Sequence, residues 1–211
     1  MEVPIQKSQF ATGSGIYAQI QNLDADLIPY LIQSANERNE ADAQNNCEGF
    51  MGNIEKNLLS LGLVLPPPVK PPAGVVLPFQ FIRFVGNRGY ISGHGPQNPD
   101  GSIAAPFGKV GHELTVQQGY EAARLTALSI LGSLKRALGD LDRVTHWCRV
   151  FGMVNSAAGF GMQPSVINGF SDLILELYGP EVGGHARSAV GMAELPFNIP
   201  IEIEAEVQIA S

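Results

Sequence analysis

The sequence has few of the residues that mark metal, redox or disulfide-rich proteins. It contains only 2 cysteines, Cys47 and Cys148, which form neither a CxxC pair nor a zinc spacing. Its 4 histidines share no HxH or HExxH spacing: His94, His112, His146 and His185. A GxSxG elbow and a strand-linked GxGxxG loop are missing too, which argues against a serine hydrolase and a dinucleotide site. We therefore predict no metal, no cofactor and no disulfide, and expect structural or loop roles for the histidines.

Positive charge is also scarce, with 13 Lys and Arg against 20 Asp and Glu. Residues 1–50 contain seven acids against Lys7 and Arg38, a net −5 of the total −7, so the other 161 residues sum to only −2. A nearly neutral body without a basic stripe argues against nucleic acid and against an anionic membrane surface. No apolar run approaches the ~20 residues of a membrane span, and the N-terminus lacks a secretory pattern. We expect a cytoplasmic protein.

Apolar residues make up 45% of the chain, enough for one buried core. Residues 1–52 are rich in Gln, Asn and acids, and only 27–32 offers material for a short helix. We interpret 1–52 as an N-terminal extension or docking arm, and 53–211 as the globular domain. Proline clusters at 66–68 and 71–72 predict an extended linker inside that domain.

Hydrophobic periodicity predicts the elements of the domain. Thr115 and Gln118 form a capping box, and Gly139 ends the helix that the box opens. Asn53 is expected to cap a shorter helix before it. The predicted helices are 53–62, 116–138 and 164–177, and the predicted strands are 79–85, 89–92, 144–154, 187–192 and 200–209. This order predicts an α+β fold, with two long helices on one face of a mixed sheet. Because Trp, Phe and Met occur among residues expected on the other face, we infer that subunits of a homo-oligomer cover it.

The C-terminal strand carries the clearest candidate for a site. Its apolar residues alternate with Glu202, Glu204 and Glu206, so three carboxylates share one face. Upstream, Arg187 lies among small residues, and its planar guanidinium can bind a carboxylate with two hydrogen bonds. The residues alone allow equally an ion pair of Arg187 at a subunit interface. Glu204 and Glu206 are expected to be solvated or to face a channel.

Seven motifs in register resemble the RidA/YjgF family of reactive-intermediate (imine and enamine) deaminases. They extend over about 54–209 and comprise Gly86-Asn87, Ser92-Gly93-His94-Gly95-Pro96, Gly108-Lys109-Val110-Gly111, residues 119–124, residues 139–144, Ala186-Arg187-Ser188 and residues 201–205. The resemblance implies a chorismate-mutase-like α+β fold, a homotrimer, and ligand clefts between subunits. Residues 1–52 have no counterpart in it.

The resemblance also implies roles for single residues. Arg187 would bind the carboxylate of a 2-imino acid, and Glu202 would position the hydrolytic water. Substrate-binding positions correspond to Phe79, Ser92, Gly93, Asn168 and Ala189. Phe79 replaces the family's cleft tyrosine, and Ala189 replaces a cysteine often found there. Loss of the tyrosine hydroxyl would weaken or redirect the chemistry by roughly 1–3 kcal/mol if its partner stays buried.

The expected activity is therefore cofactor-free hydrolysis of 2-imino or enamino acids to 2-oxo acids and ammonia. A trimer that binds a small carboxylate or a partner protein without turnover is the alternative, as is recruitment to a larger imine in a biosynthetic pathway. Ribonuclease activity, suggested by an older family name, fits the charge poorly. If 187–192 and 200–209 formed a simple hairpin, Arg187 would face Gln208, roughly 20 Å from Glu202. We thus expect an irregular connection, or a cleft that joins Arg187 of one subunit to Glu202 of another.

Overall fold

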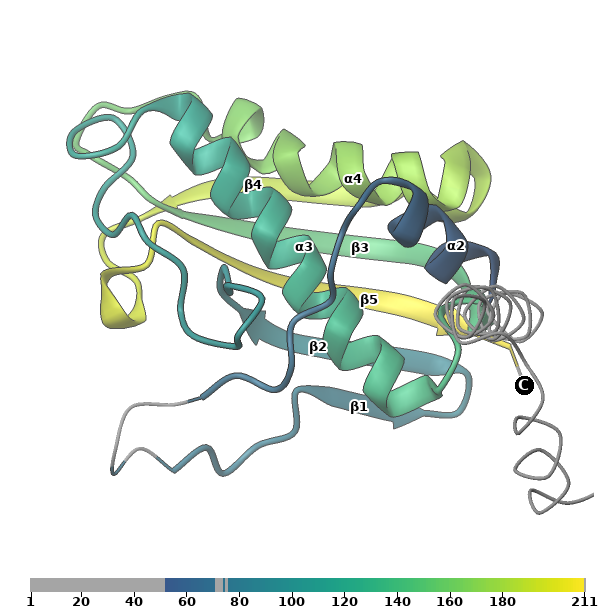
Figure 1. The fold of residues 1–211 in the computed structure, drawn as a ribbon. Helices are drawn as coiled ribbons and strands as arrows, with labels where there is room; N and C mark the ends of the chain where they lie inside the picture. Colours follow the sequence, from purple (N-terminus) through teal and green to yellow (C-terminus); the bar gives the residue numbers. More distant parts are fainter. Residues whose placement is uncertain (1–51, 71–73, 75, 211) are drawn as a thin grey trace, which may run out of the picture. The chain divides into compact units, whose positions relative to one another are not determined.

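The computed structural model describes residues 52–70, 74 and 76–210. The predicted arm, apart from Gly52, and the predicted short helix at 27–32 lie outside these residues. The described chain forms a five-stranded sheet in the order β1-β2-β5-β3-β4 (Figure 1). The strands are β1 (Ile82–Val85), β2 (Arg88–His94), β3 (Val144–Asn155), β4 (Ala186–Met192) and β5 (Ile201–Ile209). All pairings are antiparallel except that of β4 with β3, which is parallel, so the predicted mixed sheet is confirmed.

The last two strands do not form the hairpin considered above. β3 lies between β4 and β5 and pairs with both, so the connection at 193–200 crosses one strand. Val150 of β3 is the partner of Arg187 on one side and of Ala205 on the other. Arg187 is therefore level with Ala205 and not with Gln208. Periodicity identified both strands, but it carries no information about which strands are neighbours.

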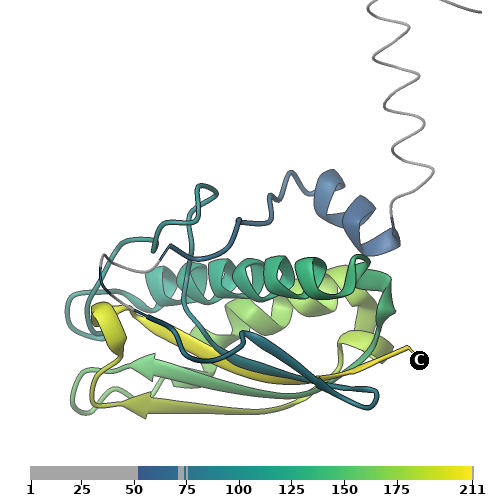
Figure 2. The same cartoon turned by 90° about the horizontal axis from the view of Figure 1, so that it is seen from below.

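Two long helices, α3 (Val116–Leu138) and α4 (Gln163–Gly183), cover one face of the sheet, as predicted (Figure 2). The main core lies between them and the apolar face, and its largest fully buried side chains include Trp147, Phe170 and Ile203. The helix backbones approach closely at Gly169 of α4, where a Cβ would lie 2.0 Å from the carbonyl oxygen of Tyr120. Only glycine fits this contact.

The predicted ends of α3 are confirmed. The Thr115 side chain accepts from the Gln118 backbone N–H, the Gln118 side chain accepts from the Thr115 N–H, and Gly139 is left-handed with φ 78°. The predicted end of α4 is instead an interruption. Gly179 has φ 72° and precedes Pro180, and helical turns resume through Gly183.

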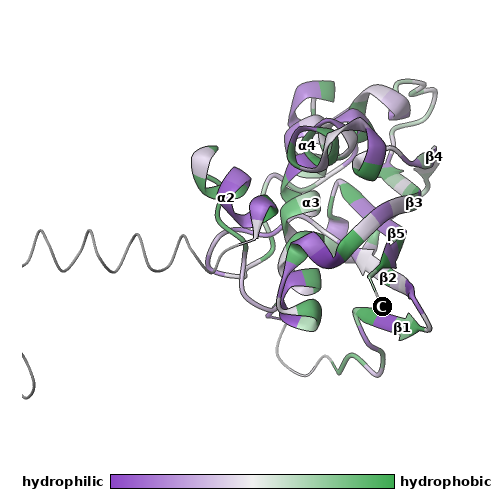
Figure 3. Cartoon of the chain, turned by 90° about the vertical axis from the view of Figure 1, so that its right-hand side faces the viewer, coloured by the Kyte–Doolittle hydropathy of each residue, from purple (hydrophilic) through white to green (hydrophobic). Residues whose placement is uncertain are grey.

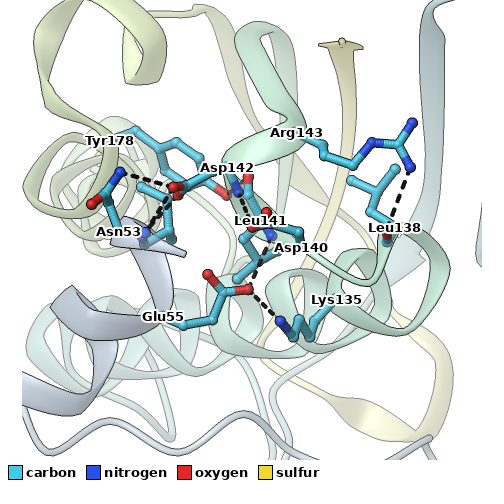
Figure 4. A network of polar contacts seen from close by, with 10 residues as sticks. Asn53, Glu55, Lys135, Leu138, Asp140, Leu141, Asp142, Arg143 and Tyr178 are labelled. Atoms are coloured by element: carbon cyan, nitrogen blue, oxygen red, sulfur yellow. Dashed lines mark hydrogen bonds and ion pairs between the residues drawn. The ribbon is translucent and has the colours of Figure 1, made fainter. Parts of the chain in front are cut away.

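A shorter helix, α2 (Asn53–Ser60), is joined to the body by a polar network (Figure 4). Asp142 accepts from the backbone N–H groups of Asn53 and Ile54 at 2.7 and 2.9 Å. Glu55 accepts from Lys135 Nζ at 2.6 Å and from the backbone N–H of Leu141 at 3.0 Å. The prediction of Asn53 as N-cap was wrong by one residue: Gly52 is the N-cap, and an aspartate distant in sequence supplies the capping oxygens.

The other face of the sheet is not covered by a described helix. Polar and apolar residues alternate along the strands (Figure 3), and on β5 this alternation directs Glu202, Glu204 and Glu206 to the open face. Tyr90 is 42% exposed, and Phe151 is half-buried close to it around a small depression. None of the described helices has the length and apolar character needed to cross a bilayer.

Candidate active site

A hollow of about 640 Å³ opens at the rim of the sheet, beside the C-terminal end of β2. We call it the rim hollow. Its walls come from the segment before β1, the end of β2, helix α3 and the turn at Pro196–Asn198. They include Leu77, Phe79, Phe81, Ile82, Gly93, His94, Ile103, Ser133, Arg136, Ala137, Phe197, Ile199 and Glu202. Such a volume lies within the range of roughly 300–1,000 Å³ that is usual for small-molecule sites.

A β-bulge creates this hollow. Ile91 pairs with Ala205 and His94 with Ile203, so β2 has one residue more than β5 between these pairs. β1 begins only at Ile82, so the end of β2 has no strand beside it on that side. There Ser92 donates from its backbone N–H to the Phe81 carbonyl and from its hydroxyl to the Gln80 carbonyl. The sheet therefore opens where the bulge lies.

Glu202 reaches the rim hollow because Gly93 has no side chain. A Cβ on Gly93 would lie 1.9 Å from Glu202 Oε1, so any other residue would displace the carboxylate. Burial raises the pKa of the half-buried Glu202, and the neighbouring charge of Glu204 raises it further. No cation contributes to the shift. Such a carboxylate holds a proton more readily than an exposed glutamate does.

A hydrogen-bonded network of three side chains forms another part of the wall of the rim hollow. His94 Nδ1 lies 2.7 Å from the carbonyl oxygen of Ser92, which can only accept, so Nδ1 carries the proton. His94 Nε2 then accepts from the Ser133 hydroxyl at 2.9 Å, and Ser133 accepts from Arg136 Nη2 at 3.0 Å. Burial, more than the positive charge of Arg136, lowers the pKa of His94 to about 4. His94 is therefore neutral, and its hydrogen bonds through Ser133 orient Arg136.

Arg187 is held in the same way at the other edge of the sheet. Its Nη1 donates to Asn168 Oδ1 at 3.0 Å and to Ser171 Oγ at 2.9 Å, and its Nη2 donates to the Pro164 carbonyl at 3.3 Å. Ser171 also bonds His185 Nε2 at 2.9 Å, and burial lowers the pKa of that histidine. Arg187 and Asn168 thus lie together, with Ala189 two residues along the same strand.

The structure divides the predicted site residues between these two places. Phe79, Gly93 and Glu202 line the rim hollow, whereas Arg187, Asn168 and Ala189 line neither of the two hollows described. Ser92 borders a smaller hollow of about 260 Å³ on the open face.

Arg187 and Glu202 also lie on opposite faces of the sheet. Arg187 is paired with Val150, whose side chain points to the helices, whereas Glu202 is paired with Met153 on the open face. Within one chain they cannot contact the same small molecule.

Sequence reasoning missed Ser133 and Arg136 as lining residues. Arg136 occurs in the last turn of α3, where a cation also stabilises the helix dipole, so its position gave no sign of a pocket. Three acids, Glu55, Asp140 and Asp142, also have oxygens within 4.8 Å of one another among the described residues. These acids accept backbone hydrogen bonds at helix ends, and Glu55 is paired with Lys135, so we interpret the cluster as structural.

Comparison with known proteins gives the relationship of the chain. Residues 55–203 match the family model described as "YjgF/chorismate_mutase-like, putative endoribonuclease". The chain belongs to the RidA/YjgF family. Protein TCP17 of Trypanosoma cruzi is 40% identical over 160 residues, which are 75% of this chain and 95% of that protein.

Two solved structures extend the relationship. Atu1372 of Agrobacterium tumefaciens, described as of unknown function, is 39% identical with a TM-score of 0.67 and coverage of 75% of this chain and 94% of its own. A Shewanella oneidensis protein described as a "putative endoribonuclease" is 30% identical, also with a TM-score of 0.67, and the match covers 75% of this chain and 100% of its own. The predicted α+β fold of the family is thereby confirmed.

Proposed function

We propose that this protein hydrolyses reactive 2-imino or enamino acids to 2-oxo acids and ammonia, with Glu202 as the residue that directs water. The observation that supports this most is a half-buried carboxylate with a raised pKa, uncompensated by a cation, in the wall of a hollow of about 640 Å³. The chemistry requires no metal or organic cofactor from the chain.

Glu202 relays two protons from oxygen to nitrogen in this mechanism. It first accepts a proton from water as the water oxygen attacks the imine carbon and donates that proton to the nitrogen, which gives a carbinolamine. It then accepts the proton of the carbinolamine hydroxyl and donates it to the amino nitrogen, the carbon–nitrogen bond breaks, ammonia leaves, and the oxygen that came from water becomes the carbonyl oxygen of the 2-oxo acid. A carboxylate whose pKa is raised by burial suits both relays, because it is a stronger base toward water than an exposed glutamate and can still return the proton.

The carboxylate of the substrate binds Arg187 of a neighbouring subunit in this proposal. Arg187 and Glu202 of one chain face opposite sides of the sheet, so a shared substrate requires two chains. The uncovered sheet face supports self-association, since Tyr90 is exposed there beside the half-buried Phe151. We propose the homotrimer that the family resemblance implies. Asn168 then orients Arg187, because its Oδ1 accepts a hydrogen bond from Arg187 Nη1 at 3.0 Å.

The test compares three variants with the wild type on freshly generated imino acid. Glu202→Gln keeps the shape but cannot carry a proton, and we expect a loss of roughly 10²-fold or more in kcat/KM. Arg187→Ala should raise KM strongly. Glu206→Gln is the matched control, because Glu206 lies on the same face of β5 but near Arg88 and Arg149, away from the rim hollow. If the imino acid decays equally fast with wild type and Glu202→Gln, the proposal is wrong.

Binding without turnover is the second candidate, and two observations favour it. Phe79 is 50% exposed at the rim hollow and offers no hydroxyl, and Arg187 already makes three hydrogen bonds to helix α4 of its own chain. A rise in melting temperature with a 2-oxo acid, in the absence of any imine hydrolysis, would select this candidate.

A further inference from the structure

The rim hollow extends from one side of the sheet to the other. Glu202 borders it from the open face, whereas Ser133, Arg136 and Ala137 border it from helix α3 on the covered face. The two polar groups therefore border the hollow from different layers of the fold. The hollow therefore has two polar ends.

The volume of the hollow is larger than the smallest imino acids need. Such an acid has six non-hydrogen atoms, and even if each took the roughly 30 Å³ that a molecule of liquid water takes, the acid would occupy no more than about 180 Å³. The hollow measures about 640 Å³. A small substrate at Glu202 would leave most of this space to solvent.

The space between the two ends is apolar. Phe79 and Phe81 meet edge to face with ring centroids 5.4 Å apart, and Phe81 lies 4.9 Å from the His94 ring. Ile82, Ile103 and Ile199 complete the wall. Aromatic rings in this arrangement favour a flat, apolar group.

The far end offers hydrogen-bond donors that are already oriented. Arg136 donates from Nη1 to the Pro66 carbonyl at 2.9 Å and from Nη2 to Ser133. These contacts use two of the five N–H groups of a guanidinium, and the others can serve a ligand. Because Ser133 gives its proton to neutral His94, this end donates hydrogen bonds through Arg136 and selects an acceptor.

We propose that the rim hollow selects a 2-imino or enamino acid whose long side chain carries an aryl-sized apolar part and ends in a hydrogen-bond acceptor. The reacting carbon lies at Glu202, the apolar part between Phe81 and Ile199, and the acceptor at Arg136. This inference rests on the proposed function for the reaction, but the selectivity of the hollow is a separate property that binding alone can test.

The experiment measures dissociation constants by calorimetry for three 2-oxo acids, which are products of the proposed reaction. Pyruvate fills only the Glu202 end, phenylpyruvate adds the aryl group, and 4-hydroxyphenylpyruvate adds the distal acceptor. Burial of an aryl group predicts at least roughly tenfold tighter binding of phenylpyruvate than of pyruvate. The distal hydroxyl should add roughly a further threefold to tenfold.

Two variants and one control locate the effect. Ala137→Trp fills the far end from an exposed position of α3, and it should remove the preference for both aryl acids without weakening pyruvate. Arg136→Met should remove only the gain from the distal hydroxyl. Glu121→Trp adds the same side chain at another exposed position of α3, outside the hollow, and should change nothing.

Three outcomes overturn the inference: equal affinity for all three acids, no binding of any of them, or an aryl preference that persists in Ala137→Trp. The failure of the proposed function looks different. If the aryl acids bind as expected but no imine is hydrolysed, the selectivity of the hollow stands and the catalytic proposal falls.

Discussion

Arg187→Ala and Glu202→Gln, each impaired when expressed alone, should restore activity to each other when they assemble together. Within one chain Arg187 and Glu202 lie on opposite faces of the sheet, and β3 separates their strands. Arg187 is level with Ala205, which lies three residues from Glu202, so the two residues are about 10 Å apart along the strand direction. Their strands are also two positions apart in the sheet, which adds a separation of about 10 Å across it. The proposed active site therefore takes Arg187 from one subunit and Glu202 from the next.

The geometry determines the expected yield. In a one-to-one mixture of Arg187→Ala and Glu202→Gln, half of the subunits have an intact arginine and the other half an intact glutamate. A site needs both at the same interface, so about one quarter of the sites are complete. This fraction holds for any closed ring of subunits. A site within one chain would restore nothing, because every chain lacks one of the two groups.

The assay uses co-expression, so that the variants assemble at random. Imine hydrolysis is then compared with the wild type and with each variant expressed alone. A sample mixed after separate purification is the control for exchange of subunits. Activity near a quarter of the wild type supports the shared site, whereas activity at the level of the single variants refutes it. If Arg187→Ala alone were fully active, the role proposed for Arg187 would be wrong.

Three further predictions concern protonation and packing. Glu204 raises the pKa of Glu202, and the proposed activity is lost as pH falls through that pKa. Glu204→Gln should therefore shift the acid limb of the pH profile of kcat/KM to lower pH, and a limb that does not move contradicts the role of Glu202. The pKa of His94 is lowered from 6.5 to about 4 in the folded protein, so as pH falls the unfolded chain takes up the proton first. The free energy of unfolding should therefore decrease by up to ~3 kcal/mol as the pH is lowered from 6.5 to 4. Urea titrations should show a flatter pH dependence for His94→Gln. Gly169→Ala places a Cβ 2.0 Å from the Tyr120 carbonyl and should cost about 3 kcal/mol, whereas Gly161→Ala, with no atom within 4 Å, should leave the melting temperature almost unchanged.

Much of the fold followed from local patterns. The capping box at Thr115, the glycine at 139 and the alternation along 201–209 each depend on neighbours in sequence, and each was read correctly. The sequence analysis predicted no order of the strands, because the position of β3 between β4 and β5 results from the crossover through α4, which periodicity does not encode. The capping of α2 by Asp142 was missed for the same reason, since 88 residues separate Asp142 from Ile54.

The candidate site shows the same division. The family resemblance pointed to Glu202 and Gly93, and the structure brings their atoms together at the bulge. Arg136 carries no local sign of its position, because only the packing of α3 beside the bulge makes it part of a wall. Arg187 and Glu202 face opposite sides of the sheet because of the way their strands pair with β3. Local sequence patterns do not contain this pairing, so the two faces could not be predicted.

The bulge in β2 separates the part of the protein that must stay fixed from the part that can vary. Glu202 belongs to a central strand with hydrogen-bonded neighbours on both sides, while the chain at 77–81 that forms one wall belongs to no strand. Substitutions in that wall would alter which molecules fit the hollow and leave the carboxylate of Glu202 in place. The architecture thus allows new specificities to evolve around an unchanged acidic group.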